Sequence, residues 1–216
     1  MIIAVINQKG GTGKTCTAVH FAYWLSQKKD ISVQLIDGDA QQSSSTWLNS
    51  LSNKIRCTPL FDPDELAEQI PLLAEETDYT IIDGAGSITE STRVILYYAN
   101  IALIPCQPTA LDIHSSSSVL RLIKQAQGFR KGDLQGVSFL SRAIPRTRLK
   151  EEARQVLAQS TEVKLLKTVI HQRQAIADAF GQQAVVWEMG GDAKKAAVEY
   201  SSLCKEVIAL CPPEKN

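Results

Sequence analysis

The first 22 residues constrain the fold more than any other part of the chain. An apolar run, IIAVI, is followed by the glycine-rich stretch NQKGGTGKT and then by a segment, CTAVHFA, that suits a helix. A phosphate-binding loop requires this strand–loop–helix order, because small residues let backbone N–H groups wrap phosphates and the helix adds its positive end. Lys14 would then reach the β- and γ-phosphate oxygens, and Thr15 would offer a hydroxyl to Mg²⁺.

Apolar, β-branched runs alternate with segments of helical periodicity along the whole chain. The strand candidates are MIIAVI, VQLID, YTIID, IALIPC, GVSFLS and VKLLKTVI, and helices are expected near 14–28, 64–77, 90–99, 112–127, 148–159, 172–181 and 192–210. This alternation is typical of a mostly parallel, twisted sheet with helices on both faces. With the phosphate-binding loop, it predicts an α/β fold of the P-loop NTPase class. Because no linker or repeat interrupts the pattern, we expect a single domain over residues 1–216.

Composition narrows the class of protein without naming a partner. Hydrophobic residues make up 44% of the 216 residues and charged residues 21%, which suits a soluble globular protein. Lysine plus arginine (23) equals aspartate plus glutamate (23), so net charge argues neither for nor against nucleic acid. Since no apolar run approaches the roughly 20 residues of a membrane span, we expect a cytoplasmic protein. The five cysteines show no CxxC or metal-ligand spacing, so reduced, mostly buried thiols are expected.

Three aspartates lie at the ends of predicted strands. Asp37 and Asp39 end VQLIDGD, and Asp83 ends YTIID. In open α/β sheets, ligands bind at the carboxyl ends of the strands. An aspartate after an apolar strand, such as Asp83, suits a Walker B residue that holds Mg²⁺ through water. Asp37 and Asp39 could be ordinary turn residues, but their spacing near a phosphate loop favours metal positioning and activation of the attacking water.

A second lysine, Lys9, precedes the glycines of the loop. The string KGGTGKT resembles the deviant Walker A motif of the ParA/MinD family of ATPases, in which the early lysine belongs to the active site of a second subunit. DGDAQ resembles the first switch region of the family, and IIDGAG resembles its Walker B motif. The resemblance covers nearly the whole chain. The chain is similar in particular to the short DNA-segregation ATPases of the ParF kind, which carry a segment like HQRQA.

The resemblance implies ATP and Mg²⁺ as cofactors and a homodimer when ATP is bound. The nucleotide-binding residues implied are Lys9, Gly10, Gly11, Thr12, Gly13, Lys14, Thr15, Cys16 and Arg173. The implied catalytic set is Lys9, Lys14 and Asp39, and the implied metal set is Thr15, Asp37 and Asp83. Lys9 would reach across the dimer and neutralise charge on the transferred phosphoryl group, as an arginine finger does with gains of roughly 10³ to 10⁵.

Two stretches depart from the family pattern, and the chain starts close to its first strand. The usual switch aspartate is followed by proline and glutamine, whereas this chain has Ala40 and Gln41. Many members have Cys-Pro-Pro where this chain has Gly-Ala-Gly at 84–86. Larger relatives begin with a helix-turn-helix domain, and its absence here leads us to expect no sequence-specific operator binding.

A local basic patch suggests what the nucleotide cycle acts on. SRAIPRTRLKEEAR, residues 141 to 154, has five basic and two acidic side chains in a chain with no overall excess. Such a patch can contact phosphates without reading bases, as in non-specific DNA binding. The candidate DNA contacts are Arg142, Arg146, Arg148 and Lys150. The alternative from charge alone is a solvated surface, but segregation ATPases that the chain resembles bind DNA as ATP-bound dimers.

We therefore expect a partitioning ATPase that is nucleoid-associated, slow by itself and stimulated by a partner. The partner would be a centromere-binding protein on plasmid or chromosomal DNA, or an adaptor on a protein cargo such as a carboxysome or chemoreceptor cluster. A MinD-like membrane role is less favoured, because Pro212 and Pro213 end the last helix and few cations line it. Two alternatives remain. One is a metabolic enzyme that shares the phosphate-binding loop, and the other is a nucleotide-dependent interaction module with negligible turnover.

Overall fold

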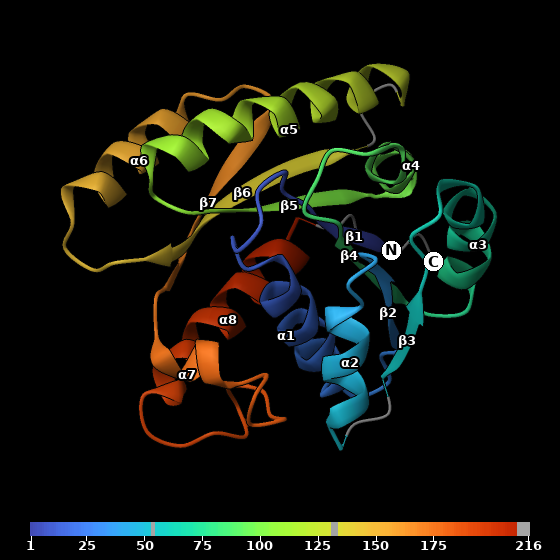
Figure 1. Cartoon of the computed structure of the whole chain (residues 1–216), viewed down its shortest axis with the longest axis horizontal. Coiled ribbons are helices and arrows are strands. Elements are labelled where there is room, and N and C mark those ends of the chain that lie inside the picture. Colours follow the sequence, from blue (N-terminus) through green and yellow to red (C-terminus); the bar gives the residue numbers. More distant parts are fainter. Residues whose placement is uncertain (53–54, 131–133, 211–216) are drawn as a thin grey trace.

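The computed structural model describes residues 1–52, 55–130 and 134–210, and its strands and helices alternate as the sequence predicts (Figure 1). The strands are β1 (Ile2–Val5), β2 (Val33–Gly38), β3 (Arg56–Pro59), β4 (Tyr79–Gly84), β5 (Ile101–Cys106), β6 (Gln135–Ala143) and β7 (Val163–His171). The helices are α1 (Lys14–Ser26), α2 (Ser43–Ser50), α3 (Pro63–Glu75), α4 (Glu90–Tyr98), α5 (Ala110–Phe129), α6 (Arg148–Ala158), α7 (Gln174–Asp178) and α8 (Ala193–Ile208). Every predicted strand and helix is confirmed, whereas α2 and β3 were not predicted.

The strands form one parallel sheet in the order β3-β2-β4-β1-β5-β6-β7. Because side chains alternate along a strand, each strand feeds two cores. Ile3 and Val5 of β1 face α1, α2 and α8, while Ile2 and Ala4 face α3, α4, α5 and α6. Figure 1 shows these two groups of helices on opposite sides of the sheet. The predicted α/β fold of the P-loop NTPase class, with helices on both faces, is confirmed.

The two unpredicted elements lie at one edge of the sheet. Helix α2 follows Gln42, whose left-handed φ of 50° turns the chain. In the first turn of α2, the N–H of Ser45 donates a 2.8 Å hydrogen bond to the Asp37 carboxylate. Strand β3 is four residues long and ends in Pro59, as an edge strand can, because proline cannot donate to a further strand.

Other sequence predictions have mixed outcomes. Cys16, Cys57, Cys106 and Cys204 are free thiols, two of them buried. None of the helices in the described part of the chain is long and apolar enough to cross a membrane. Pro212 and Pro213, on which the predicted end of the last helix depends, lie outside the described residues.

Candidate functional site

The loop between β1 and α1 has the geometry of a phosphate-binding loop. Gly11 and Gly13 adopt left-handed φ angles of 75° and 96°, which glycine permits without steric cost. Within the described residues, no side chain caps the start of α1, and its first turn carries no acidic residue. The first N–H groups of α1 therefore remain available to an anion, and the helix dipole favours one.

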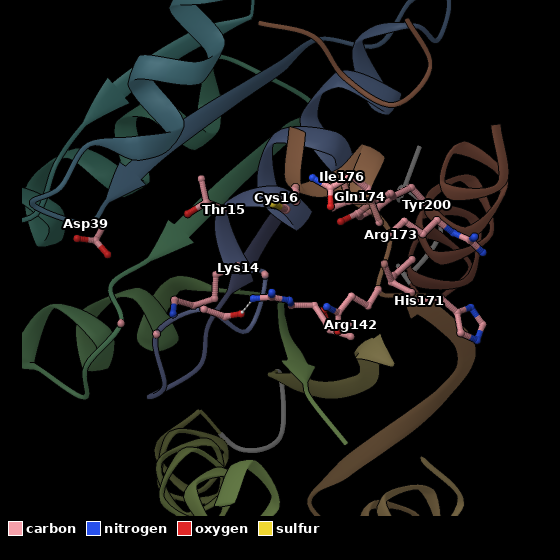
Figure 2. A pocket seen from close by; sticks show the side chains of 18 residues that line it. Lys14, Thr15, Cys16, Asp39, Arg142, His171, Arg173, Gln174, Ile176 and Tyr200 are labelled. Atoms are coloured by element: carbon pink, nitrogen blue, oxygen red, sulfur yellow. Dashed lines mark hydrogen bonds between the residues drawn. The ribbon is translucent and has the colours of Figure 1, made fainter. Parts of the chain in front are cut away.

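A cavity of about 410 Å³ lies against this loop (Figure 2). Six of the eight residues from 9 to 16 line the cavity, and the other two, Lys9 and Thr12, do not. The six are Gly10, Gly11, Gly13, Lys14, Thr15 and Cys16. Burial raises the pKa of the Cys16 thiol to about 11, so this residue contributes a neutral wall. Asp39, Arg142 and Arg173 also line the cavity, so it gathers most of the predicted nucleotide-binding residues.

The two lysines of the loop occupy different positions. Lys14 is 7% exposed, and its Nζ donates to the carbonyl oxygen of Lys9 over 3.0 Å. Burial lowers the pKa of Lys14, and the Asp83 and Asp39 carboxylates act in the opposite direction. The buried Thr12 hydroxyl donates to the same Lys9 carbonyl over 3.3 Å. The backbone of Lys9 thus holds the amine of Lys14. Lys9 itself is half-buried and is not among the described residues that line the cavity.

Parallel pairing brings Asp37 and Asp83 side by side at the carboxyl ends of β2 and β4. The Asp37 oxygens accept from backbone N–H groups of Ser45 and Asp39, so Asp37 also anchors α2. Asp83 is 1% exposed, and among the described residues neither of its oxygens has a hydrogen-bond partner of good geometry. Burial raises the pKa of Asp83 to about 7, while the nearby Thr15 hydroxyl acts in the opposite direction.

These features fit a bound magnesium ion. A buried carboxylate with free lone pairs is costly unless something compensates it, and a cation held beside Asp83 and Thr15 would do so. Within the described residues no cluster of three or more His, Cys, Asp or Glu side chains could hold a metal by itself. A magnesium site in a nucleotide-binding protein needs no such cluster, because phosphates and water supply most of the ligands.

Asp39 is a turn residue that also lies at the cavity, and its role in activating water stays a prediction. It forms a turn, because its Oδ1 accepts from Gln41 N–H over 3.0 Å and its carbonyl oxygen accepts from Gln42 N–H over 2.9 Å. It also lines the cavity, on the side away from His171 in Figure 2. A turn that presents a carboxylate to the cavity is compatible with activation of water.

The far wall of the cavity comes from β7, α7 and α8. Arg173 donates to Glu199 over 2.5 Å and lies 3.4 Å from Asp192, so its guanidinium is engaged by carboxylates. Glu199 also accepts from His171 Nδ1 and N–H over 2.8 and 3.0 Å. Burial opposes it, but these donors hold the pKa of Glu199 below its ordinary value. Arg173, a predicted nucleotide contact, thus lies in the wall of the cavity, but its guanidinium is already paired with carboxylates. Nothing in the sequence indicated that Glu199 would pair with Arg173 or that Tyr200 would line the cavity.

The predicted DNA contacts do not form one group. Arg146, Arg148 and Lys150 lie on the segment that leads from β6 into α6, where Arg148 pairs with Glu152 over 2.7 Å and Lys150 with Glu151 over 3.1 Å. Arg142 instead lines the cavity, and its Nη1 donates to the carbonyl oxygen of Gly11 over 2.7 Å. Arg142 therefore lies at the cavity, apart from the other three, and its role in DNA binding stays a prediction. The sequence grouped it with the others because the four are close along the chain.

Comparison with known proteins agrees with this geometry. Residues 3–186 match the family described as the CobQ/CobB/MinD/ParA nucleotide binding domain. The chain is 25% identical over 210 residues to maintenance of carboxysome distribution protein A of Halothiobacillus neapolitanus, covering 95% of each chain. It is 28% identical over 128 residues to protein ParA of Rhizobium radiobacter, covering 58% of this chain and 57% of that one.

Solved structures share the fold. An ATP complex of a Cyanothece McdA variant has a TM-score of 0.74 at 18% identity and covers 99% of this chain and 98% of its own. A putative plasmid partition protein from Borrelia burgdorferi B31 bound to AMPPNP has a TM-score of 0.75 at 16% identity, covering 97% and 99%. With a family match across most of its length and a phosphate-binding loop in the expected place, the chain belongs to the CobQ/CobB/MinD/ParA nucleotide-binding family.

Proposed function

We propose that this chain is a positioning ATPase that hydrolyses ATP to ADP and phosphate with Mg²⁺. The observation that carries the proposal is the division between the two loop lysines, with Lys14 buried at the cavity and Lys9 outside its described lining. Lys14 and the N–H groups at the start of α1 bind phosphate oxygens. Thr15 and Asp83 hold the metal ion, and Asp39 accepts a proton from the attacking water. ATP supplies the phosphoryl group that is transferred to water.

Lys9 reaches the nucleotide of a second subunit in this proposal, so that ATP holds the dimer together. The test is light scattering with an Asp39→Ala variant, which should bind ATP without hydrolysing it. Saturating ATP and Mg²⁺ should give a dimer, and ADP should leave a monomer. Asp30→Ala, at a side chain that is 83% exposed, is the matched control and should hydrolyse ATP like the wild type. A variant that stays monomeric at saturating ATP would contradict the proposal.

The dimer binds duplex DNA without sequence preference through Arg146, Arg148 and Lys150, and so localises to the nucleoid within the cytoplasm. Two patches on one dimer would double the phosphate contacts, and each added contact steepens the fall of log K with log[salt] by about 0.9. Replacing these three residues with alanine should weaken ATP-dependent binding in anisotropy titrations with two unrelated duplexes. Equal affinity in ATP and ADP, or strong preference for one duplex, would contradict this part.

A matched control triple lies on α8, where Lys194, Lys195 and Lys205 are exposed. Its replacement with alanine removes the same charge, so DNA affinity should fall only through the change in net charge. If both triple variants lose affinity equally, the patch is not the contact surface.

The cargo has two candidates. Plasmid or chromosomal DNA, carried through a centromere-binding protein, is supported by the similarity to ParA. A carboxysome-like protein cargo, carried through an adaptor, is supported by the relative that is similar over 95% of both chains. Phosphate-release assays with each kind of partner distinguish them, since only the cognate partner should stimulate the DNA-bound ATPase. The product of the neighbouring gene is the first partner to assay.

A further inference from the structure

Three side chains from the ends of β5 and β6 hold the carbonyl groups of the phosphate-binding loop. Gln107 Nε2 and Arg142 Nη1 each donate to the carbonyl oxygen of Gly11 over 2.7 Å. Ser141 Oγ donates to the carbonyl oxygen of Thr12 over 2.8 Å. The two strands that follow β1 across the sheet therefore fix two successive peptide groups of the loop.

Fixing these carbonyl groups also fixes phosphate donors. The C=O of one residue and the N–H of the next lie in one plane and point in opposite directions. The bonds to Gly11 and Thr12 thus set the directions of the Thr12 and Gly13 N–H groups. Ser141 approaches so closely that a Cβ at residue 13 would lie 3.0 Å from its Oγ, which adds to the need for glycine there. Oriented N–H groups of this kind bind phosphate without reorganising.

The backbone is distorted at the residue that makes the charged contact. The pairing of β6 with β7 shifts register between Leu140 and Ala143, and Arg142 has a left-handed φ of 53°. Bulges of this kind re-aim side chains and occur next to active sites. A left-handed conformation is costly for arginine and persists only where surrounding contacts determine it. Figure 2 shows the Arg142 side chain extending toward the loop that precedes Lys14.

The same segment continues into the proposed DNA patch. Arg146 follows with a left-handed φ of 58°, and Arg148 begins α6. A displacement of this segment would be transmitted to Arg142 through only a few residues. The charge of Arg142 also acts on the first turn of α1, where it lowers the pKa of Cys16 against the larger effect of burial.

We infer that Arg142 is a positioning residue of the phosphate-binding loop, and that it links DNA contact at Arg146 and Arg148 to nucleotide affinity. The link rests on the proposed function, whereas the positioning role does not. Gln107 shares the acceptor, so either side chain can hold the Gly11 carbonyl when the other is removed.

The positioning role is tested without DNA, by titrating a fluorescent ADP analogue. Arg142→Ala and Gln107→Ala should each weaken binding about threefold, the scale of one net hydrogen bond, and the double variant should lose more than the product. Arg142→Lys should restore part of the loss, because it keeps a charged donor. Lys29→Ala, which removes a side chain that is 93% exposed and lies in no proposed site, should bind ADP like the wild type. Unchanged affinity in the double variant overturns the positioning role.

The link is tested by measuring the coupling between a non-hydrolysable ATP analogue and duplex DNA. In the wild type each ligand should raise the affinity for the other by the same factor. In Arg142→Ala this factor should fall to the part that dimerisation alone supplies, while DNA affinity without nucleotide should change only through the loss of one positive charge. An unchanged factor overturns the link. A wild-type protein that binds no DNA overturns the proposed DNA function and the link together, while the ADP titrations still decide the positioning role.

Discussion

Acid should destabilise the fold through His20, whose ring lies in the core between α1 and α8. Its Nε2 accepts a hydrogen bond from Val186 N–H over 3.2 Å, so Nδ1 carries the proton and donates to the Cys16 carbonyl oxygen over 2.6 Å. The ring stacks on Tyr200 with centroids 4.4 Å apart and lies 5.4 Å from that of Trp47. The ring therefore has no free acceptor for a second proton, and its hydrogen-bond and ring partners among the described residues carry no negative charge.

Burial lowers the pKa of His20 from 6.5 to about 4, while the bond to the Cys16 carbonyl acts in the opposite direction. An unfolded chain binds the proton near pH 6.5, so it gains protons first as the pH falls. The contribution of neutral His20 is fully present above that pH and is lost progressively toward pH 4. Integrating between these pKa values gives a loss of about 2 kcal/mol in the free energy of unfolding between about pH 7.5 and 5.

The assay is urea unfolding of nucleotide-free protein, followed by tryptophan fluorescence at several pH values. His20→Phe can keep the stack on Tyr200 but leaves Val186 N–H unpaired, so it should be less stable than the wild type near neutral pH. Other titrating groups are common to both proteins and cancel in the difference. The gap between the two should therefore shrink by about 2 kcal/mol on going to about pH 5. Parallel stability curves would refute the reasoning.

Other expectations follow from individual contacts. Lys14→Ala should weaken ADP binding at least about tenfold in calorimetry, because it removes a charged phosphate donor, whereas Lys9→Ala should leave ADP affinity intact; equal losses would contradict their separate roles. Gly84→Ala should cost about 1–3 kcal/mol in thermal unfolding, since its Cβ would lie 2.9 Å from a neighbouring side chain, and the control Gly86→Ala, with 3.7 Å, should be nearly neutral. Glu199→Gln should cost about 2 kcal/mol in urea unfolding, because it weakens charged hydrogen bonds to its arginine and histidine; wild-type stability would contradict this.

Regular elements were predictable from the sequence because their signals are local. The strands from β1 to β7, apart from β3, are apolar runs that two cores cover. Helix α1 follows the loop motif, and α3, α4, α6 and α8 each carry an apolar face. Helix α2 begins with three serines and depends on partners outside the helix. Asp37 binds its first turn, and Trp47 donates from Nε1 to the Ala184 carbonyl oxygen. Trp47 is 1% exposed, so its indole packs in the core of the chain.

The site was predictable to the extent that motifs are contiguous. The phosphate-binding loop and the strand-end aspartates lie where the sequence placed them, because parallel strands bring their carboxyl ends to one edge. The positions of Arg142 and Glu199 at the site could not be predicted, because their contacts are with residues far away along the chain. Arg142 contacts Gly11 from 131 positions away, and the bulge that aims it has no sequence signature. Its nearness along the chain to Arg146 and Arg148 led to the prediction of a shared DNA contact, which gave no indication of its contact with the phosphate-binding loop.

The departure from the family pattern at residue 84 has a steric cause in this chain. A Cβ at Gly84 would lie 2.9 Å from Ile6 Cγ2 and 3.1 Å from the Val5 carbonyl oxygen, and one at Gly38 would lie 2.9 Å from the Asp83 carbonyl oxygen. Each glycine directly follows a strand-end aspartate, so the backbones of β1, β2 and β4 can approach closely where Asp37 and Asp83 stand opposite each other. Ile6 fills the space that a larger residue at 84 would need. The close approach buries Asp83, whose oxygens have no hydrogen-bond partner of good geometry among the described residues, so a cation held beside it would stabilise the ionised carboxylate.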